Sequence, residues 1–202
     1  MGKTVDYYFS PISPWTYLGH ARFADMAKRH GALVNVKPVD FGKVFPVSGG
    51  LPLPKRAPQR QAYRLVELKR FSDFLKVPLN LHPKFFPAPG DLAAQYIVAA
   101  GHAGGSGAAM LLAGAVQRAC WVEERNIADA ETLGAICKEQ GMDAAALAAA
   151  AQSAAVKAEY EGYTQEAIAR NVFGAPSYVI DGEIFWGQDR LDFVERALAA
   201  KK

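Results

Sequence analysis

The sequence predicts an α/β fold in which both ends of the chain build one sheet and the middle forms a helical insertion. Three observations predict this arrangement. Strand and helix signals alternate in the first 40 residues, alanine-rich helical signals fill the middle, and strand signals return after residue 170. The predicted order is therefore β-α-β, a long helical stretch, and then β-β-α.

The first 40 residues predict a strand, a helix and a second strand. Apolar residues alternate with more polar ones between residues 5 and 9, as in a half-buried strand. Ser13 followed by Pro14 is typical of a helix start, because serine caps the first turn and proline is tolerated at the first helical position. Residues 33–39 predict the next strand, which should be parallel to the first because a helix connects them.

The middle of the chain predicts helices separated by loops. Proline and glycine fill residues 43–58, so we expect a loop there, and four prolines make residues 77–90 irregular. The glycine-rich residues 101–107 lack the strand and lysine of a phosphate-binding loop and are expected to connect two helices. Asp129 and Asp143 are expected N-caps. Periodicity and alanine content predict helices at residues 59–75, 92–100, 108–125, 130–140 and 144–169.

The last 30 residues predict a hairpin and a helix. Strand signals at residues 176–180 and 183–186 are joined by Asp181-Gly182, which is typical of a two-residue hairpin turn. Asp189 then precedes an apolar periodic segment and is expected to cap the last helix. The whole order of elements is that of a thioredoxin fold with a helical subdomain inserted in the middle.

The length and the net charge of the chain limit the classes of protein to which it can belong. The 202 residues suffice for a thioredoxin-like domain from residues 1–42 and 171–202 and an inserted helical subdomain from residues 43–170. A formal net charge of +3 gives no reason to expect a nucleic-acid partner. We find no apolar run of about 18 residues and no apolar leader at the start, so we expect no membrane span and a cytoplasmic protein.

The cysteines and histidines show no metal-binding or redox pattern. Cys120 and Cys137 do not form a C-x-x-C pair and lie in helical stretches, so we interpret both as small buried hydrophobes. The four histidines show no ligand spacing. We therefore expect no metal site.

The start of the first helix is a candidate chemical site. Ser13-Pro14-Trp15-Thr16 stands where a thioredoxin fold carries C-P-x-C, so a dithiol cycle is impossible there. The N-terminus of a helix still stabilises an anion such as a thiolate, and the Ser13 hydroxyl can donate a hydrogen bond to it. Lowering a thiol pKa of ~8.5 by ~1.5–2 units requires about 2–2.7 kcal/mol, which these two effects can supply. Alternatively, Ser13 is only an N-cap.

Two further stretches each have a structural and a functional interpretation. Ala175-Pro176 either begins a strand or forms a cis peptide bond that presents the backbone of Ala175 to a peptide-like ligand. Gly187-Gln188-Asp189 either ends the hairpin or binds a ligand with a carboxylate and an ammonium group, the second held by Asp189. The γ-glutamyl end of glutathione carries both groups on one carbon.

Together these stretches resemble the 2-hydroxychromene-2-carboxylate isomerases, relatives of kappa-class glutathione transferases and of the disulfide oxidoreductase DsbA. The resemblance implies glutathione as cofactor, a small aromatic acid as substrate and a homodimer. It implies that Ser13 activates the glutathione thiol, that Ala175-Pro176 bonds the peptide backbone, and that Gly187-Gln188-Asp189 holds the γ-glutamyl end. The motifs that carry it are Tyr7-Tyr8-Phe9, Ser13-Pro14-Trp15-Thr16-Tyr17-Leu18, Phe173-Gly174-Ala175-Pro176 and Trp186-Gly187-Gln188-Asp189-Arg190-Leu191.

The loop before the first inserted helix departs from the family pattern. Relatives tend to carry an asparagine near a glycine there, whereas this chain has Ser48-Gly49-Gly50-Leu51-Pro52. Lys55 and Arg56, the first cations after this loop, either bind the carboxylate of the substrate, with Phe86 as an apolar face, or are solvated. The same two interpretations apply to the whole basic run, which continues with Arg60 and Arg64.

Three functions follow as hypotheses. The leading one is a glutathione-dependent isomerase of 2-hydroxychromene-2-carboxylate-like aromatic acids, with Ser13 stabilising the glutathione thiolate. A second is a kappa-type glutathione transferase, which would keep the conjugate as its product. A third is a DsbA-like protein without enzyme activity that binds peptides and has lost its cysteines.

Overall fold

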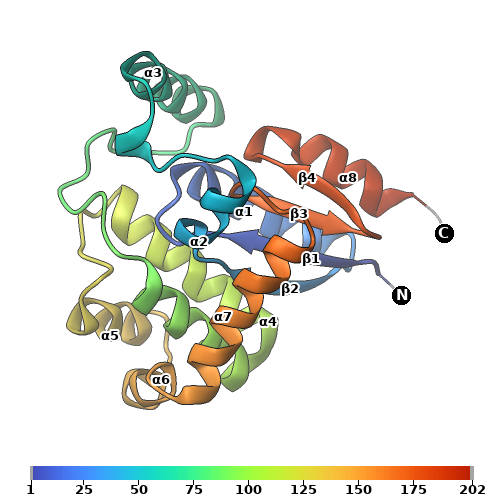
Figure 1. Cartoon of the computed structure of the whole chain (residues 1–202). Coiled ribbons are helices and arrows are strands. Elements are labelled where there is room, and N and C mark those ends of the chain that lie inside the picture. The colour runs from blue at the N-terminus through green and yellow to red at the C-terminus, as the bar shows by residue number, and fades with distance from the viewer. Residues whose placement is uncertain (1, 201–202) are drawn as a thin grey trace.

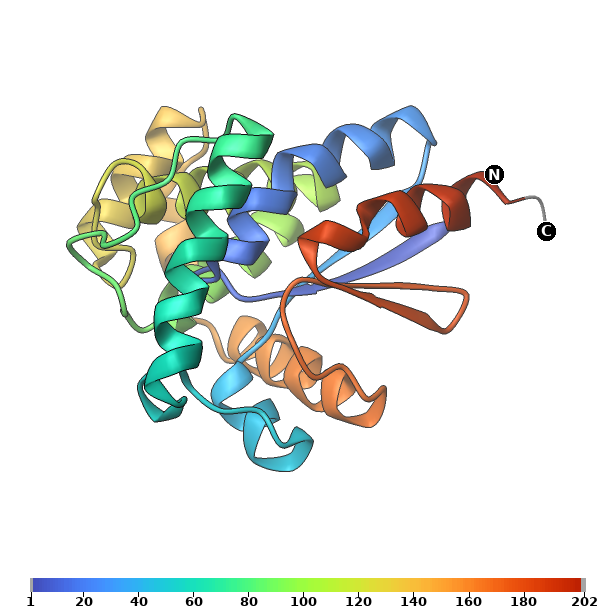
Figure 2. The same ribbon diagram turned by 90° about the horizontal axis from the view of Figure 1, so that it is seen from above.

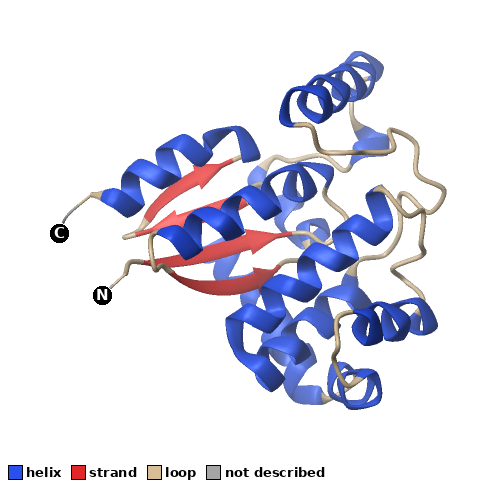
Figure 3. Ribbon diagram, turned by 180° about the vertical axis from the view of Figure 1, so that it is seen from behind, coloured by secondary structure: helices blue, strands red, loops and turns tan. Residues whose placement is uncertain are grey.

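The computed structural model describes residues 2–200 and contains a four-stranded mixed sheet in the order β2-β1-β3-β4 (Figures 1 and 3). β1 is parallel to β2 and antiparallel to β3, and β3 is antiparallel to β4. The strands span Thr4–Phe9 (β1), Leu33–Pro38 (β2), Ser177–Ile180 (β3) and Glu183–Trp186 (β4). Both chain ends therefore contribute to one sheet, which confirms the predicted α/β class and thioredoxin-like fold.

The helices surround this sheet. Figure 2 shows α1 and α8 on one side of the sheet and α7 on the other. α4 packs against both β2 and α1. The helical bounds are Pro14–Arg29 (α1), Phe41–Ser48 (α2), Leu53–Lys55 (η1), Pro58–Leu75 (α3), Asp91–Trp121 (α4), Ala130–Glu139 (α5), Ala144–Ala151 (α6), Ala154–Ala169 (α7), Gln188–Arg190 (η2) and Leu191–Ala199 (α8); η1 and η2 are 3₁₀ turns.

Side-chain caps set the starts of several helices. The Oγ atom of Ser13 accepts a hydrogen bond from the Thr16 amide at 3.2 Å, and Pro14 occupies the first helical position. Asp129 and Asp143 cap α5 and α6 in the same way, as predicted. These polar residues therefore cap the first turns of their helices, which is the role that the sequence predicted for them.

The predicted loop at residues 43–58 is wrong in its first part. Asp40 caps a helix by accepting a hydrogen bond from the Gly42 amide at 2.8 Å, and this helix, α2, continues through Pro46 to Ser48. Pro46 is tolerated because it lies near the end of a short helix and removes a single backbone hydrogen bond. Gly49 ends the helix in the left-handed conformation, with φ of 78°.

Two other helix boundaries also differ from the prediction. Residues 144–169 form two helices rather than one, because Ser153 is extended and caps α7. By contrast, the glycine-rich segment does connect two helical parts of α4 as predicted, because the backbone is not helical at Gly104 and Gly105. Asp189 does not cap α8, because the 3₁₀ turn η2 comes first and its carboxylate pairs with Arg190 instead.

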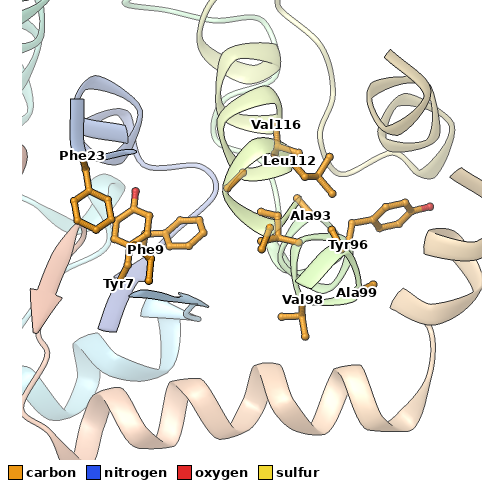
Figure 4. Close-up of a cluster of buried hydrophobic side chains, with 14 of the residues drawn as sticks. Tyr7, Phe9, Phe23, Ala93, Tyr96, Val98, Ala99, Leu112 and Val116 are labelled. Carbon is orange, nitrogen blue, oxygen red and sulfur yellow. The ribbon is translucent and has the colours of Figure 1, made fainter. Parts of the chain in front are cut away.

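The main core joins the sheet to α4. On β1, the Tyr7 ring stacks on Phe9 and Tyr178, with centroids 4.6 and 5.4 Å apart, and the buried side of α4 lies beyond (Figure 4). Within residues 2–200, α4 is the helix long and apolar enough by length and composition to cross a membrane. Here it packs against α1, α5, α6, α7 and β2, which is the position of a core helix.

A histidine is buried inside this core. Nδ1 of His20 lies 3.2 Å from the Tyr7 hydroxyl, and its Nε2 lies 2.9 Å from the carbonyl oxygen of Met110. The ring packs against Gly114, where a Cβ atom would come within 3.0 Å of it. Burial lowers the pKa of His20 to about 4. A neutral histidine therefore links α1, β1 and α4.

We expect this histidine to make the fold sensitive to acid. Because the folded-state pKa is about 4 and the ordinary value is 6.5, the unfolded chain binds a proton first as the pH falls. Stability is therefore present above pH 6.5 and is lost towards pH 4, by about 2 kcal/mol between pH 7 and pH 5. Urea unfolding at both pH values measures this loss. His20→Gln should remove most of it, while the control His82→Gln, at an exposed position, should not.

Candidate active site

Three separate stretches of the chain meet at one end of the sheet. Pairing of Tyr8 with Ser177 places Pro176 beside the end of β1, from which the chain turns into Ser13 and α1. The Gly187 amide donates a hydrogen bond to the carbonyl oxygen of Pro176 at 2.9 Å. Residues 175–176 therefore lie beside the end of β1 that leads to Ser13, and Gln188 lies against α1 at Gly19 and Arg22.

Ser13 is held so that its hydroxyl hydrogen can be donated. Its Oγ atom accepts from the Thr16 amide, and its own amide donates to the Ser10 carbonyl oxygen at 3.0 Å. Within residues 2–200, no histidine or carboxylate bonds to this hydroxyl, so no base is in place to make it a nucleophile. The arrangement instead suits a hydrogen-bond donor beside the positive end of a helix.

The Ala175-Pro176 peptide bond is cis, as the functional interpretation of this dipeptide required. The loop before it is fixed by close packing. A Cβ atom on Gly174 would lie 2.3 Å from the Trp186 ring, so glycine is required there. The ring of Phe173 meets Trp186 edge-on with centroids 4.8 Å apart, and the Ser177 hydroxyl donates to the Gly174 carbonyl oxygen at 2.7 Å.

The turn Gly187-Gln188-Asp189 presents its residues in different directions. Gly187, with φ of 108°, starts the turn. Gln188 is buried, and its Oε1 accepts a hydrogen bond from Arg22 on α1 at 2.9 Å. Asp189 is exposed and pairs with Arg190. At this turn a ligand can reach the Asp189 carboxylate, whereas the Gln188 side chain faces α1.

Aromatic and apolar groups from the insertion cover the first turns of α1. The Trp15 ring meets Phe71 of α3 edge-on, with centroids 5.9 Å apart. The Tyr17 hydroxyl donates to the Pro78 carbonyl oxygen at 2.8 Å, in the segment that follows α3. Gly90, at the end of this segment, lies against Ile12. An apolar wall therefore borders the serine.

A cluster of cations lies beside this wall. The guanidinium of Arg64 lies 5.3 Å from the centroid of Phe86 and 5.9 Å from that of Trp121. Burial and the nearby Arg56 lower the pKa of Arg64 to about 10, so it stays charged at neutral pH. Arg56 itself donates from Nε to the Leu51 carbonyl oxygen at 2.8 Å, and Lys55 is exposed in η1.

The sequence analysis named Arg64 as a member of the basic run but gave it no role of its own. No acidic side chain pairs with it in the described part of the chain. The signal available in the sequence was its place in the basic run, four positions after Arg60, which on a helix is the same face. The sequence could not show that this face meets Phe86.

The chain supplies no thiol at this site. Cys120 and Cys137 are both buried and free, as predicted, in α4 and α5. Burial raises their pKa values to about 12 and about 11. Within residues 2–200, no group of three or more histidine, cysteine or acidic side chains is arranged to hold a metal ion.

Comparison with known proteins agrees with this fold. The model of the DSBA-like thioredoxin domain matches residues 4–199, nearly the whole chain. Fold and site together define a DsbA-like thioredoxin-fold protein in which serine replaces the first cysteine of the dithiol.

The particular family follows from individual relatives. The chain is 32% identical to a 2-hydroxychromene-2-carboxylate isomerase of Sphingobium xenophagum over 98% of this chain and 99% of the relative. It is 30% identical to the enzyme of that name from Pseudomonas putida, over 96% and 93% of the two chains. A solved 2-hydroxychromene-2-carboxylate isomerase structure matches with a TM-score of 0.80 and 28% identity, over 96% and 93%. The chain belongs to the 2-hydroxychromene-2-carboxylate isomerase family.

Two weaker similarities concern glutathione. Over 82 residues the chain is 32% identical to glutathione S-transferase kappa 1 of Caenorhabditis elegans. This matched segment covers 40% of this chain and 36% of the relative. The cytosolic disulfide reductase DsbM of Pseudomonas aeruginosa, solved with GSH, has a TM-score of 0.68 at 20% identity and covers 98% of this chain and all of its own. At that identity, DsbM shows the shared fold alone.

We expect the protein to have no thiol chemistry of its own. Because both thiols are buried and have raised pKa values, neither should react with Ellman's reagent in the native state, and both should react after denaturation. The protein should also fail to accelerate the reduction of insulin disulfides by dithiothreitol. Ser13→Cys serves as the positive control, since it places a thiol at the N-terminus of α1 and should react at once.

Proposed function

We propose that this protein is a glutathione-dependent isomerase of aromatic acids resembling 2-hydroxychromene-2-carboxylate. The observation that carries the proposal is Ser13, a free hydrogen-bond donor at the N-terminus of α1, in a site where the chain has no thiol of its own. Such a site suits a thiolate brought by a second molecule. Membership in an isomerase family gives the reaction class.

The residues around Ser13 fit a peptide-like thiol. The Ala175-Pro176 bond lies beside the end of β1 from which the chain leads to Ser13, and there the backbone of Ala175 would pair with the peptide backbone of glutathione. The exposed Asp189 carboxylate would bind the ammonium group of the γ-glutamyl end of glutathione. The η2 turn would bind the carboxylate group of that same end. The buried Thr16 hydroxyl has no partner within residues 2–200, which leaves one more polar group near the start of α1.

Glutathione would supply a thiolate that adds reversibly to the conjugated substrate, which permits rotation about the former double bond. The chain's own part is to keep that thiolate charged. Ser13 donates a hydrogen bond to it, the N-terminus of α1 contributes its positive end, and the wall formed by Trp15 and Phe71 limits access of water. No residue needs to exchange a proton with the substrate for this role.

The substrate carboxylate has a candidate partner in Arg64. Its guanidinium is charged, partly buried and without an acidic partner in residues 2–200, and it lies over the Phe86 ring. A flat aromatic acid needs an apolar face and a cation with planar donors, and the pair supplies both. Arg56 is close enough to add to the positive potential, whereas Lys55 points to solvent.

The serine should be tested through the thiol it stabilises. Wild-type protein should turn over many equivalents of substrate with substoichiometric glutathione, and Ser13→Ala should lower the rate about 10–150-fold, the worth of one charge-assisted hydrogen bond. The ultraviolet absorbance of the thiolate, measured against pH, should show a lower thiol pKa in the wild-type complex than in the variant. Accumulation of a stable conjugate would instead identify a transferase, and equal thiol pKa values would remove this role from Ser13.

The arginine should be tested by comparing two substrates. Arg64→Met should raise KM for the acidic substrate about 10–100-fold and leave glutathione affinity unchanged, because a cation that pairs with the carboxylate is lost. An uncharged ester of the substrate should show little change. Lys69→Met, at an exposed cation of the same helix, is the matched control. Equal losses on both substrates would mean that Arg64 is structural.

A further inference from the structure

The guanidinium of Arg22 joins the middle of α1 to the η2 turn. Its Nη1 atom donates to the side-chain Oε1 of Gln188 at 2.9 Å, and the carbonyl oxygen of Gln188 lies 3.4 Å from the same nitrogen. The two residues are 166 positions apart in the chain. One side chain of α1 therefore holds both the side chain and the backbone of the residue that precedes Asp189.

Arg22 makes these bonds without an acidic partner. Within residues 2–200 no carboxylate pairs with its guanidinium, whereas Arg29 on the same helix pairs with Glu195 at 2.8 Å. Arg22 is partly buried, and its charge acts on the interior: burial raises the pKa of Tyr178, and the charge of Arg22 acts in the opposite direction. A hydrogen bond from a charged donor is among the stronger ones in proteins, so this contact holds Gln188 firmly.

The Gln188 side chain faces the protein and not a ligand. It is 1% exposed, and a Cβ atom on Gly19 would come within 2.8 Å of its Cβ atom. The backbone on its other side is held by the hydrogen bond from the Gly187 amide to the Pro176 carbonyl oxygen. Gln188 is thus an inward anchor, and the exposed Asp189 that follows it takes its direction from that anchor.

This contact is remote from the serine. Arg22 is nine positions after Ser13, which at about 1.5 Å per residue separates the two by about 13 Å along the axis of α1. At that separation the charge of Arg22 adds little to the hydrogen bond and the helix end that act at Ser13. Arg22 therefore affects the Asp189 end of the site and not the Ser13 end.

We propose that Arg22 is the positioning residue for the γ-glutamyl end of glutathione. It contacts no ligand; by anchoring Gln188, it fixes the Asp189 carboxylate where the γ-glutamyl ammonium would bind. This role rests on the proposed function, because glutathione is the molecule taken to fill the site. The affinity for glutathione is then controlled from the buried side of α1, separately from the acidity of the bound thiol.

Arg22→Met tests this role, because methionine keeps an apolar stem and removes both hydrogen bonds. The dissociation constant for glutathione, measured by calorimetry, should rise about tenfold, within the range of a hydrogen bond to a charged group. The thiol pKa of bound glutathione, measured by ultraviolet absorbance at saturation, should stay at the wild-type value, and so should kcat. Arg29→Met, at an exposed arginine of the same helix, is the matched control and should leave the affinity unchanged.

Shorter thiols separate a positioning role from a general structural one. γ-Glutamylcysteine keeps the γ-glutamyl end of glutathione, whereas cysteinylglycine lacks it. Arg22→Met should lower kcat/KM about tenfold with γ-glutamylcysteine as the thiol and leave it unchanged with cysteinylglycine. Arg22→Lys, which keeps the charge and one donor without the planar geometry, should recover part of the affinity for glutathione.

Two results would overturn the assignment of Arg22. An unchanged affinity for glutathione in Arg22→Met would show that Gln188 needs no anchor. Equal losses with γ-glutamylcysteine and cysteinylglycine would show that Arg22 supports the fold of the whole site. A wild-type protein that binds no glutathione would instead defeat the proposed function itself, and this role with it.

Discussion

The close approach of α1 to the η2 turn is the constraint on which the site depends. A Cβ atom on Gly19 would come within 2.8 Å of the Gln188 side chain and 3.2 Å of the Tyr178 hydroxyl, so the helix can approach only with glycine there. Arg22, one turn further along, bonds both the side chain and the backbone carbonyl oxygen of Gln188. The hydrogen bonds of Arg22 join residues 166 positions apart and hold the middle of α1 against the η2 turn.

The sheet and the site were predictable where local chemistry decides the conformation. Alternation at residues 5–9, the Ser13-Pro14 helix start and the Asp181-Gly182 turn each have one favoured backbone structure, and all three appear as expected. Because the sheet joins a parallel pair to a returning hairpin, the position of residue 176 beside the end of β1 also followed from the sequence.

Other features depended on tertiary context and could not be predicted. Pro46 and two glycines suggested a loop, but a capping aspartate and a nearby helix end make α2 possible. Asp189 was expected to cap a helix, but the inward turn of Gln188 adds a 3₁₀ turn before α8. For Arg64 the sequence left two interpretations open, a solvated cation or part of an anion site, and could not show that Phe86 and Trp121 lie against it. For the η2 turn and for Arg64, the deciding contacts come from distant residues, Arg22 and Phe86.

Helix α3 has two faces with different surroundings. Arg64 lies on the inner face over Phe86, and Phe74 lies on the outer face in solvent. Because a single helix carries both faces, a change in the position of α3 on its outer side would also move Arg64 relative to the Phe86 ring.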